Sequence, residues 1–306
     1  MNRASLLVAL AGTLTLGCYQ VHDGPGTPTP TVDAGRRDAG IAPPPIRPDA
    51  GVVMPPPTDG TTFVIAEIHI PEPNAGNRAP GANLDGMDSG SGSPTPDATC
   101  EEFHRDYRSL TDGTRGVDDA FGGLIGTVEG LTGRPVDELV RERILNGELL
   151  IVITMVDRGG IDLQLALPAG PLEHDGRRLL PGNLVTPFQP LGRGSVTGPD
   201  RLTAHVTDFS AMLPAGIVPG LPFGFLHDVE LRFLYTPDGL EDGELGGWYS
   251  VDDGVADVSV LMPGIEDTVR SVLESVADIH PGPDPAICQG LSVGMTFTAV
   301  PVILVR

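Results

Sequence analysis

The chain has 306 residues, a net charge of −22 and no lysine, so all 19 of its basic residues are arginines. An acidic surface of this strength repels polyanions, which excludes nucleic acid as a partner. The missing lysine excludes Schiff-base catalysis and lysine-dependent phosphate loops.

The N-terminus has the features of an export signal. Arg3 precedes the apolar run Leu6–Leu16, and a small residue stands directly before Cys18. This pattern predicts a lipoprotein signal peptide over residues 1–17, which is removed so that Cys18 can carry lipid. Thr15 stands where such signals usually have an aliphatic residue, so a plain secreted protein with a free Cys18 thiol is the alternative. Because Tyr19 replaces the aspartate typical of inner-membrane retention, we expect an outer-membrane lipoprotein that faces the periplasm or the cell surface.

A linker is predicted over residues 18–60, ahead of a single globular domain over 61–306. The linker repeats Asp-Ala-Gly three times and clusters its prolines at Pro43–Pro45 and Pro55–Pro57. Such a segment cannot bury enough apolar surface to offset the entropy lost on ordering, and proline runs favour an extended conformation. We therefore expect a disordered, semi-stiff spacer between the membrane anchor and the domain.

The domain begins with a predicted strand over Thr62–Ile70, in which apolar and polar residues alternate. A polar loop over 71–99 follows, and loops of this length are usually functional or disordered.

Three helices are expected from apolar periodicity. The first starts at Asp118 or Asp119 and runs to about residue 131, and the second runs from Pro135 to Asn146-Gly147. The third covers about Ile265–Ile279, with acidic residues in its first turn.

The other periodic segments predict strands, which share two-residue alternation or a continuous apolar run between turns. They are Glu148–Val156, Ile161–Leu167, Leu202–Phe209, Leu226–Tyr235, Leu245–Val251 and Leu291–Val305. The predicted fold is mainly β: an antiparallel β-sandwich-like domain with about three helices packed at one end or face.

Two cysteines are left after lipidation of Cys18, namely Cys100 and Cys288. Exported proteins fold in an oxidising compartment, which favours a disulfide between them. A bridge over so long a loop would stabilise the fold by about 4–5 kcal/mol in the chain-entropy model. The alternative is a pair of buried thiols.

Aspartate-rich turns are the candidate metal site. Calcium takes six to eight oxygen ligands, which short Asp/Asn/Gly loops can supply, although the spacing does not match an EF-hand. The alternative is that these residues form turns and cap helices. The candidate calcium ligands are Asp85, Asp88, Asp106, Asp112 and Asp118.

Several short motifs recur together in one known group of proteins. They are Leu84-Asp85-Gly86, Asp112-Gly113-x-x-Gly116-Val117-Asp118-Asp119, Asn146-Gly147-Glu148 and Cys288-x-x-x-Leu291-Ser292-Val293-Gly294. With this set the chain resembles a group of exported lipoproteins of myxobacteria whose function is unknown. The resemblance implies a tethered envelope domain with paired cysteines, and it implies no activity.

Common catalytic signatures are missing from the sequence. No histidine pair has HExxH spacing, and Gly192-Arg193-Gly194-Ser195 departs from the Gly-x-Ser-x-Gly motif of serine hydrolases. Trp248-Tyr249 can stack on sugars, although such a pair more often packs in a core. We expect a non-enzymatic binding or structural domain with an unknown extracellular or periplasmic ligand. The alternative is a secreted hydrolase that acts on carbohydrate or peptide through paired carboxylates.

Overall fold

The computed structural model describes residues 60–74, 76–86, 106–156, 159–197, 201–207, 226–261, 264–279 and 288–305. All of them fall within one compact unit, Val53–Arg306. The predicted signal peptide, Cys18, nearly all of the predicted linker, Asp88 and Cys100 lie outside the described residues and stay predictions. No helix in the described ranges is long and apolar enough to cross a bilayer.

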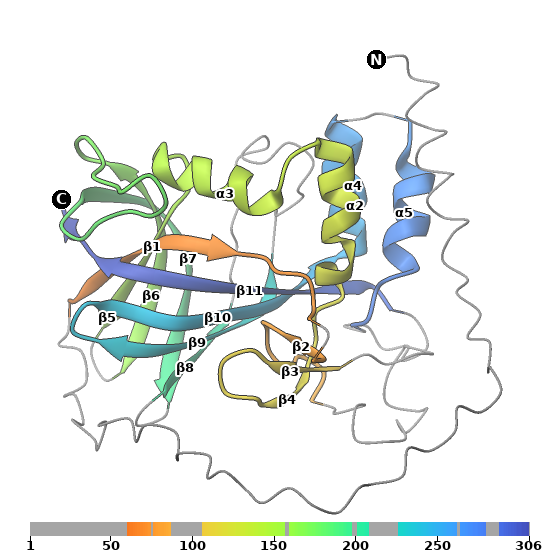
Figure 1. The fold of residues 1–306 in the computed structure, drawn as a ribbon, viewed down its shortest axis with the longest axis horizontal. Helices are drawn as coiled ribbons and strands as arrows, with labels where there is room; N and C mark the ends of the chain where they lie inside the picture. The colour runs from red at the N-terminus through yellow and green to blue at the C-terminus, as the bar shows by residue number, and fades with distance from the viewer. Residues whose placement is uncertain are drawn as a thin grey trace, which may run out of the picture. The chain divides into compact units, whose positions relative to one another are not determined.

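Eight antiparallel strands close into a barrel (Figure 1). Their order around the barrel is β7-β6-β5-β1-β11-β10-β9-β8, and β8 pairs again with β7. The strands are β1 (Thr62–His69), β5 (Leu150–Val156), β6 (Gly160–Pro168), β7 (Leu184–Thr197), β8 (Arg201–Thr207), β9 (His227–Thr236), β10 (Gly239–Ser250) and β11 (Gly290–Pro301).

The mainly β, antiparallel character of the domain is confirmed, but the sheet closes on itself where a sandwich was expected. Alternation along a strand indicates that one face is buried, and it does so equally in a sandwich and in a barrel. The closure depends on the pairing of β7 with β8, in which Gly194 lies opposite Val206. No local sequence pattern predicts this pairing.

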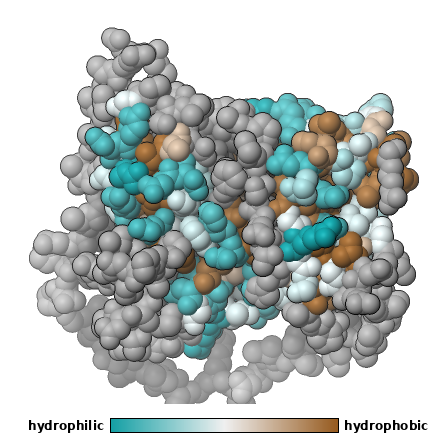
Figure 2. Space-filling view, turned by 180° about the vertical axis from the view of Figure 1, so that it is seen from behind, coloured by the Kyte–Doolittle hydropathy of each residue, from teal (hydrophilic) through white to brown (hydrophobic). Residues whose placement is uncertain are grey.

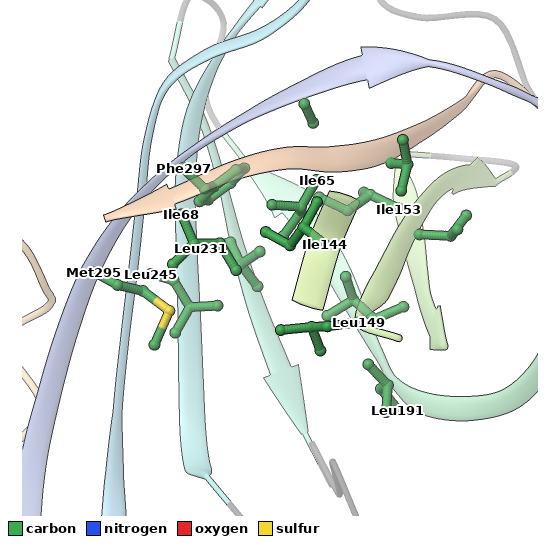
Figure 3. Close-up of a cluster of buried hydrophobic side chains, with 14 of the residues drawn as sticks. Ile65, Ile68, Ile144, Leu149, Ile153, Leu191, Leu231, Leu245, Met295 and Phe297 are labelled. Carbon is green, nitrogen blue, oxygen red and sulfur yellow. The ribbon is translucent and has the colours of Figure 1, made fainter. Parts of the chain in front are cut away.

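Apolar side chains fill the barrel interior (Figure 3). Phe233 and Phe297 meet edge to face with ring centroids 6.4 Å apart. Ile153 and Leu163 lie opposite each other on β5 and β6, and both are fully buried. Burial of this kind, at about 25 cal/mol per Å² of apolar surface, is the main force that holds the barrel together.

Within the described residues, four helices and one 3-10 turn accompany the barrel. The second predicted helix is confirmed as α3 (Val136–Leu145), whose buried residues pack against β1 from outside the barrel. The first divides into η2 (Phe121–Leu124) and α2 (Ile125–Thr132). The third is shorter than expected, as α5 (Glu266–Glu274), and it packs with α4 (Val251–Leu261), which was not predicted.

A second, three-stranded sheet and one short edge strand complete the described structure. The small sheet has the order β2-β3-β4, and the edge strand β12 runs parallel to the start of β7. Their bounds are β2 (Arg78–Ala79), β3 (Tyr107–Ser109), β4 (Arg115–Val117) and β12 (Ile303–Leu304).

Candidate functional site

Two glycines let the chain around the small sheet lie directly on the barrel wall. Gly246 and Gly294 are register partners on β10 and β11. A Cβ on Gly294 would lie 2.1 Å from the carbonyl oxygen of Pro80, and a Cβ on Gly246 would lie 2.4 Å from the amide nitrogen of Ala82. The backbone of residues 80–82 therefore rests on a patch of sheet that has no side chains.

Replacement of Gly294 by alanine should lower the free energy of unfolding by about 1–3 kcal/mol or more, because the methyl group would collide with backbone. Gly130→Ala in α2 is the matched control, since a Cβ there meets nothing within 4 Å and alanine favours helix. Urea denaturation of the full chain measures both effects. If Gly294→Ala is as stable as the unchanged protein, residues 80–82 do not pack against the barrel at this position.

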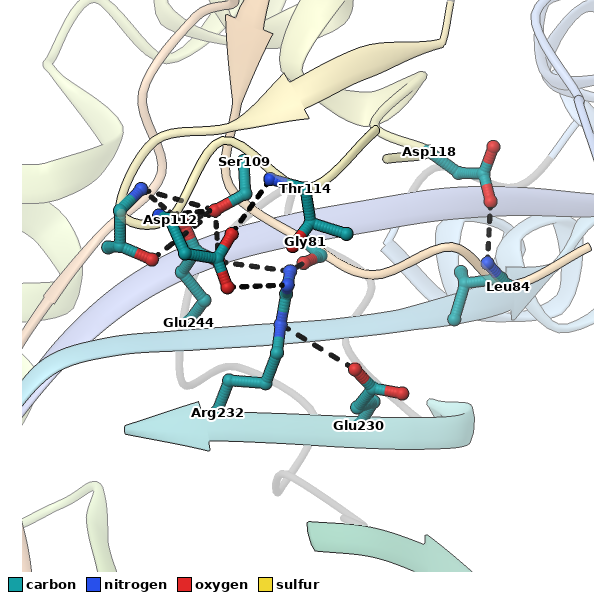
Figure 4. A network of polar contacts seen from close by, with 10 residues as sticks. Gly81, Leu84, Ser109, Asp112, Thr114, Asp118, Glu230, Arg232 and Glu244 are labelled. Atoms are coloured by element: carbon teal, nitrogen blue, oxygen red, sulfur yellow. Dashed lines mark hydrogen bonds and ion pairs between the residues drawn. The ribbon is translucent and has the colours of Figure 1, made fainter. Parts of the chain in front are cut away.

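A buried ion pair lies beside this contact (Figure 4). Arg232 on β9 and Glu244 on β10 are register partners whose Nη2 and Oε2 atoms are 3.0 Å apart. Both side chains point out of the barrel and are covered, with side-chain exposures of 8% and 0%. The Ser109 hydroxyl from β3 donates to Glu244, and Arg232 donates to the Gly81 carbonyl. The small sheet and the barrel thus share one charged network.

Asp112, one of the predicted calcium ligands, joins this network as a partner of Arg232. Its Oδ2 lies 3.4 Å from Arg232 Nη1, and its Oδ1 accepts the Thr114 N–H at 2.9 Å. Partial burial acts to raise the pKa of Asp112, but hydrogen bonds from Thr114 and Ser109 and the charge of Arg232 outweigh it and lower the pKa to about 2. Asp112 is therefore ionised and held as a partner of Arg232.

A cluster of three buried carboxyls, Asp118, Asp119 and Asp278, lies nearby. Asp119 and Asp278 accept hydrogen bonds from β11, and Asp118 accepts one from Leu84. Asp118 Oδ2 accepts the Leu84 N–H at 2.7 Å. Asp119 Oδ1 accepts the N–H groups of Gly122 and Gly294 at 3.1 and 3.0 Å. Asp278 accepts the Ser292 N–H at 2.7 Å and also the Ser292 hydroxyl.

The pKa values in this cluster are strongly raised. Burial is the largest cause for all three groups, and neighbouring carboxyls add to it. The pKa of Asp118 rises to about 9 and that of Asp278 to about 7, while the pKa of Asp119 is well above its usual range. Asp119 Oδ2 is buried and has no hydrogen-bond partner in the part of the chain that the structure describes. These groups are therefore held as neutral acids over much of the pH range.

Three of the predicted calcium ligands lie close enough to influence one another. Asp85 and Asp106 both raise the pKa of Asp118 through charge repulsion. Among the described residues, however, no three His, Cys, Asp or Glu side chains are arranged to hold a metal ion. Asp119 was predicted only as a possible helix start, and Asp278 was not singled out, because nothing in its local sequence separates it from turn-forming aspartates.

Two other candidates from the sequence occupy structural positions. Trp248 is 9% exposed, stacks on His227 with ring centroids 4.1 Å apart, and donates its Nε1–H to Asp228 at 2.7 Å. Tyr249 is buried. The pair is packed and does not form an open platform for a sugar ring. His69, which the sequence did not single out, lies on the surface between Asp137 and Glu67 at 2.9 and 3.0 Å.

An open groove of about 850 Å³ lies on the outer face of β5, β6 and β7. Its polar residues include Thr154, Gln164 and Asp162, which pairs with Arg193 at 2.9 Å between Oδ1 and Nε. Leu304 and Gly60 also line it, so both described ends of the chain meet here. On the face shown in Figure 2, hydrophobic residues reach the surface in patches between hydrophilic ones. We call the open groove on the outer face of β5, β6 and β7 the β6–β7 groove.

No family model, curated protein or solved structure matches the chain.

Proposed function

We propose that the protein is a lipid-tethered envelope protein whose barrel domain binds a ligand and performs no chemistry on it. The β6–β7 groove is the observation that carries this proposal. It is open, it combines hydrogen-bonding side chains with apolar ones, and it lies where the chain from Cys18 enters the domain at Gly60. A binding surface at the end of a long spacer can reach ligands away from the membrane.

The hydrolase alternative lacks a specific observation in its favour. Within the described residues, the carboxyls with the highest pKa values are Asp118, Asp119 and Asp278. Each is at least nine-tenths buried and accepts a backbone N–H, so each serves to hold the fold. A general acid must instead reach a substrate atom within hydrogen-bonding distance.

The tether and the binding are tested separately. Intact-mass analysis of membrane-extracted protein should show a diacylglyceryl adduct on Cys18, and Cys18→Ala should move the protein to the soluble fraction. The full chain is then titrated with a panel of oligosaccharides and unstructured peptides. We expect saturable binding without product formation, weakened by Arg193→Ala and unchanged by Arg270→Ala on the distant α5. Turnover of any panel member, or binding to none, would contradict the proposal.

Calcium remains a prediction, centred on Asp85, Asp106 and Asp118. A cation that binds only the folded state would displace the proton that keeps Asp118 neutral and raise stability by mass action. Millimolar calcium should raise the melting temperature, and Asp118→Asn should remove the rise. A melting temperature that calcium and chelator leave unchanged would leave these aspartates as turn formers and helix caps.

The Cys100–Cys288 bridge is likewise a prediction. Cys288 lies just before β11 and packs partly buried against Val251, Val255 and Ala277. Peptide mapping of the full chain without reductant should recover the two cysteines in one linked pair. Recovery of alkylated Cys100 from unreduced protein would contradict the bridge.

A further inference from the structure

Five large apolar side chains of β6, β7 and the chain end around β12 are exposed, and these segments also contribute residues to the β6–β7 groove. Leu184 and Ile303 are register partners on β7 and β12, and Leu167 lies opposite Thr186. Thr186 and Val305 line the groove itself. We call these residues the β7–β12 face; their exposures are Leu167 52%, Leu184 41%, Phe188 53%, Ile303 57% and Val305 37%.

The sequence around this face lacks acidic residues. Residues 182–199 and 288–305 contain no aspartate or glutamate, although the chain has 41 of them. Asp162, the one acid that lines the groove, is paired with Arg193. Exposed apolar side chains next to a groove whose one acidic lining residue is paired favour an uncharged, apolar occupant.

One segment of the chain has this chemistry and starts within reach. Gly60 lines the groove, where its N–H donates to the Met155 carbonyl at 2.8 Å. Val52–Pro57, with the sequence VVMPPP, has no charge and ends three residues before Gly60. At no more than about 3.6 Å per residue, Pro57 lies within about 11 Å of Gly60 and Val52 within about 29 Å.

We propose that Val52–Pro57 docks in the β6–β7 groove and covers the β7–β12 face as a tethered, proline-rich apolar ligand. Proline-rich segments bind apolar grooves at a low entropic cost because they are already extended. The short connection to Gly60 gives the segment a local concentration in the millimolar range. This inference rests on the proposed function, in which the β6–β7 groove is the ligand-binding surface. It adds that the groove prefers uncharged, proline-rich apolar segments as ligands.

Photo-crosslinking of the full chain tests the docking. Benzoylphenylalanine replaces Phe188, and after irradiation the protein is cut before aspartates, which releases Asp49–Thr58 as one peptide and Asp175–Pro199 as another. We expect these two peptides to be joined. A mixture of isotope-labelled and unlabelled protein shows whether the link lies within one chain.

Paired variants sharpen the test. Val53→Asn with Met54→Asn should reduce the crosslink by about tenfold or more, because the side-chain amides lose their hydration in an apolar contact and add no new cleavage site. The same change should raise amide exchange over residues 184–197. Val32→Asn, at another apolar residue of the linker far from Gly60 in the sequence, is the matched control and should change neither readout.

Links between chains would show that a second copy covers this face, and adducts to lipid would show that a membrane does. Either result, or no link to residues 52–57, would overturn the docking. The fractionation of Cys18→Ala and the panel titration do not depend on this result, so the two proposals can fail separately.

Discussion

The free energy of unfolding should fall as the pH rises from about 4 towards about 9, which is the range between the ordinary pKa of aspartate and that of folded Asp118. Burial raises the pKa of Asp118 to about 9 and of Asp278 to about 7. Between the unfolded and folded pKa values the folded state binds more protons, so unfolding releases protons and becomes easier at higher pH. Below about pH 4 both states are protonated, and this contribution to stability is fully present.

We expect a loss of up to about 5–6 kcal/mol between pH 5 and pH 9, since each pKa unit corresponds to about 1.4 kcal/mol and the pKa of folded Asp118 is about 9. The neighbouring carboxyls titrate as a coupled group, so their contributions do not simply add to this figure. Urea denaturation at a series of pH values measures it. Asp118→Asn should flatten the slope, because a neutral amide needs no proton. Asp267→Asn, on the exposed start of α5, is the matched control. A stability that rises from pH 5 to pH 9 would show that the cluster is ionised in the folded state.

Asp112 affects stability in a different pH range, and there stability rises with pH instead of falling. Its pKa is lowered to about 2, so its contribution to stability is present above about pH 4 and is lost as the pH falls towards 2. The side chain is partly exposed, so this effect is smaller than that of the buried cluster. The two windows do not overlap, and one titration of stability against pH separates them.

The local parts of the fold that the sequence predicted well are those with their own boundary signals. α3 begins directly after Pro135 and ends at Asn146-Gly147, as expected. The strands predicted over Glu148–Val156 and Ile161–Leu167 also form, as β5 and β6, and they pair with each other as a hairpin. In these segments local propensity and tertiary packing favour the same structure, so the pattern alone was sufficient.

β7 was not predicted because its sequence has the residues of a loop. Pro187 and Pro190 interrupt it, and two glycines follow. Among the described residues, positions 186–192 of β7 pair only with β6, since β12 pairs with residues 184 and 185 and β8 with residues 193–197. Proline is tolerated at such an edge because it needs no N–H partner there.

α4 was missed for a related reason. The strand pattern of Leu245–Val251 predicts that Val251 ends a strand, and the Asp-Asp-Gly that follows is typical of a turn. In the structure Gly254 lies against α5 and β10, where a Cβ would come within 2.7 Å of Leu273 and 2.9 Å of Tyr249. The close packing of α4 on α5 therefore overrides the weak helix propensity of glycine.

The charged network could not be found from the sequence either. Alternation along β9 and β10 places Arg232 and Glu244 on the outer face, which in an antiparallel sheet is normally solvated. Their burial results from the small sheet, whose strands come from residues 78–117, more than a hundred positions earlier. Only the glycine pair of Gly246 and Gly294 hints that backbone approaches this part of the barrel.

Removal of Glu244 should be strongly destabilising. Glu244→Ala would leave the Arg232 guanidinium buried without its nearest carboxylate and would remove the Glu244 acceptor from the Ser109 hydroxyl. Loss of one member of a buried ion pair costs about 3–5 kcal/mol. Glu241→Ala on the exposed side of the same strand is the matched control and should change stability by about 0.5 kcal/mol or less.

A double-mutant cycle separates the ion pair from the packing around it. Arg232→Met alone leaves a buried, unpaired carboxylate, so it should also destabilise the fold, whereas Arg232→Met with Glu244→Leu removes both charges and keeps most of the volume. We expect the double variant to be more stable than the sum of the single effects by about 1 kcal/mol or more, because contacting residues are not additive. Additive single effects would mean that the two side chains are solvated separately. The small sheet would then be held to the barrel mainly by the glycine contact, and Gly294→Ala would become the more damaging change.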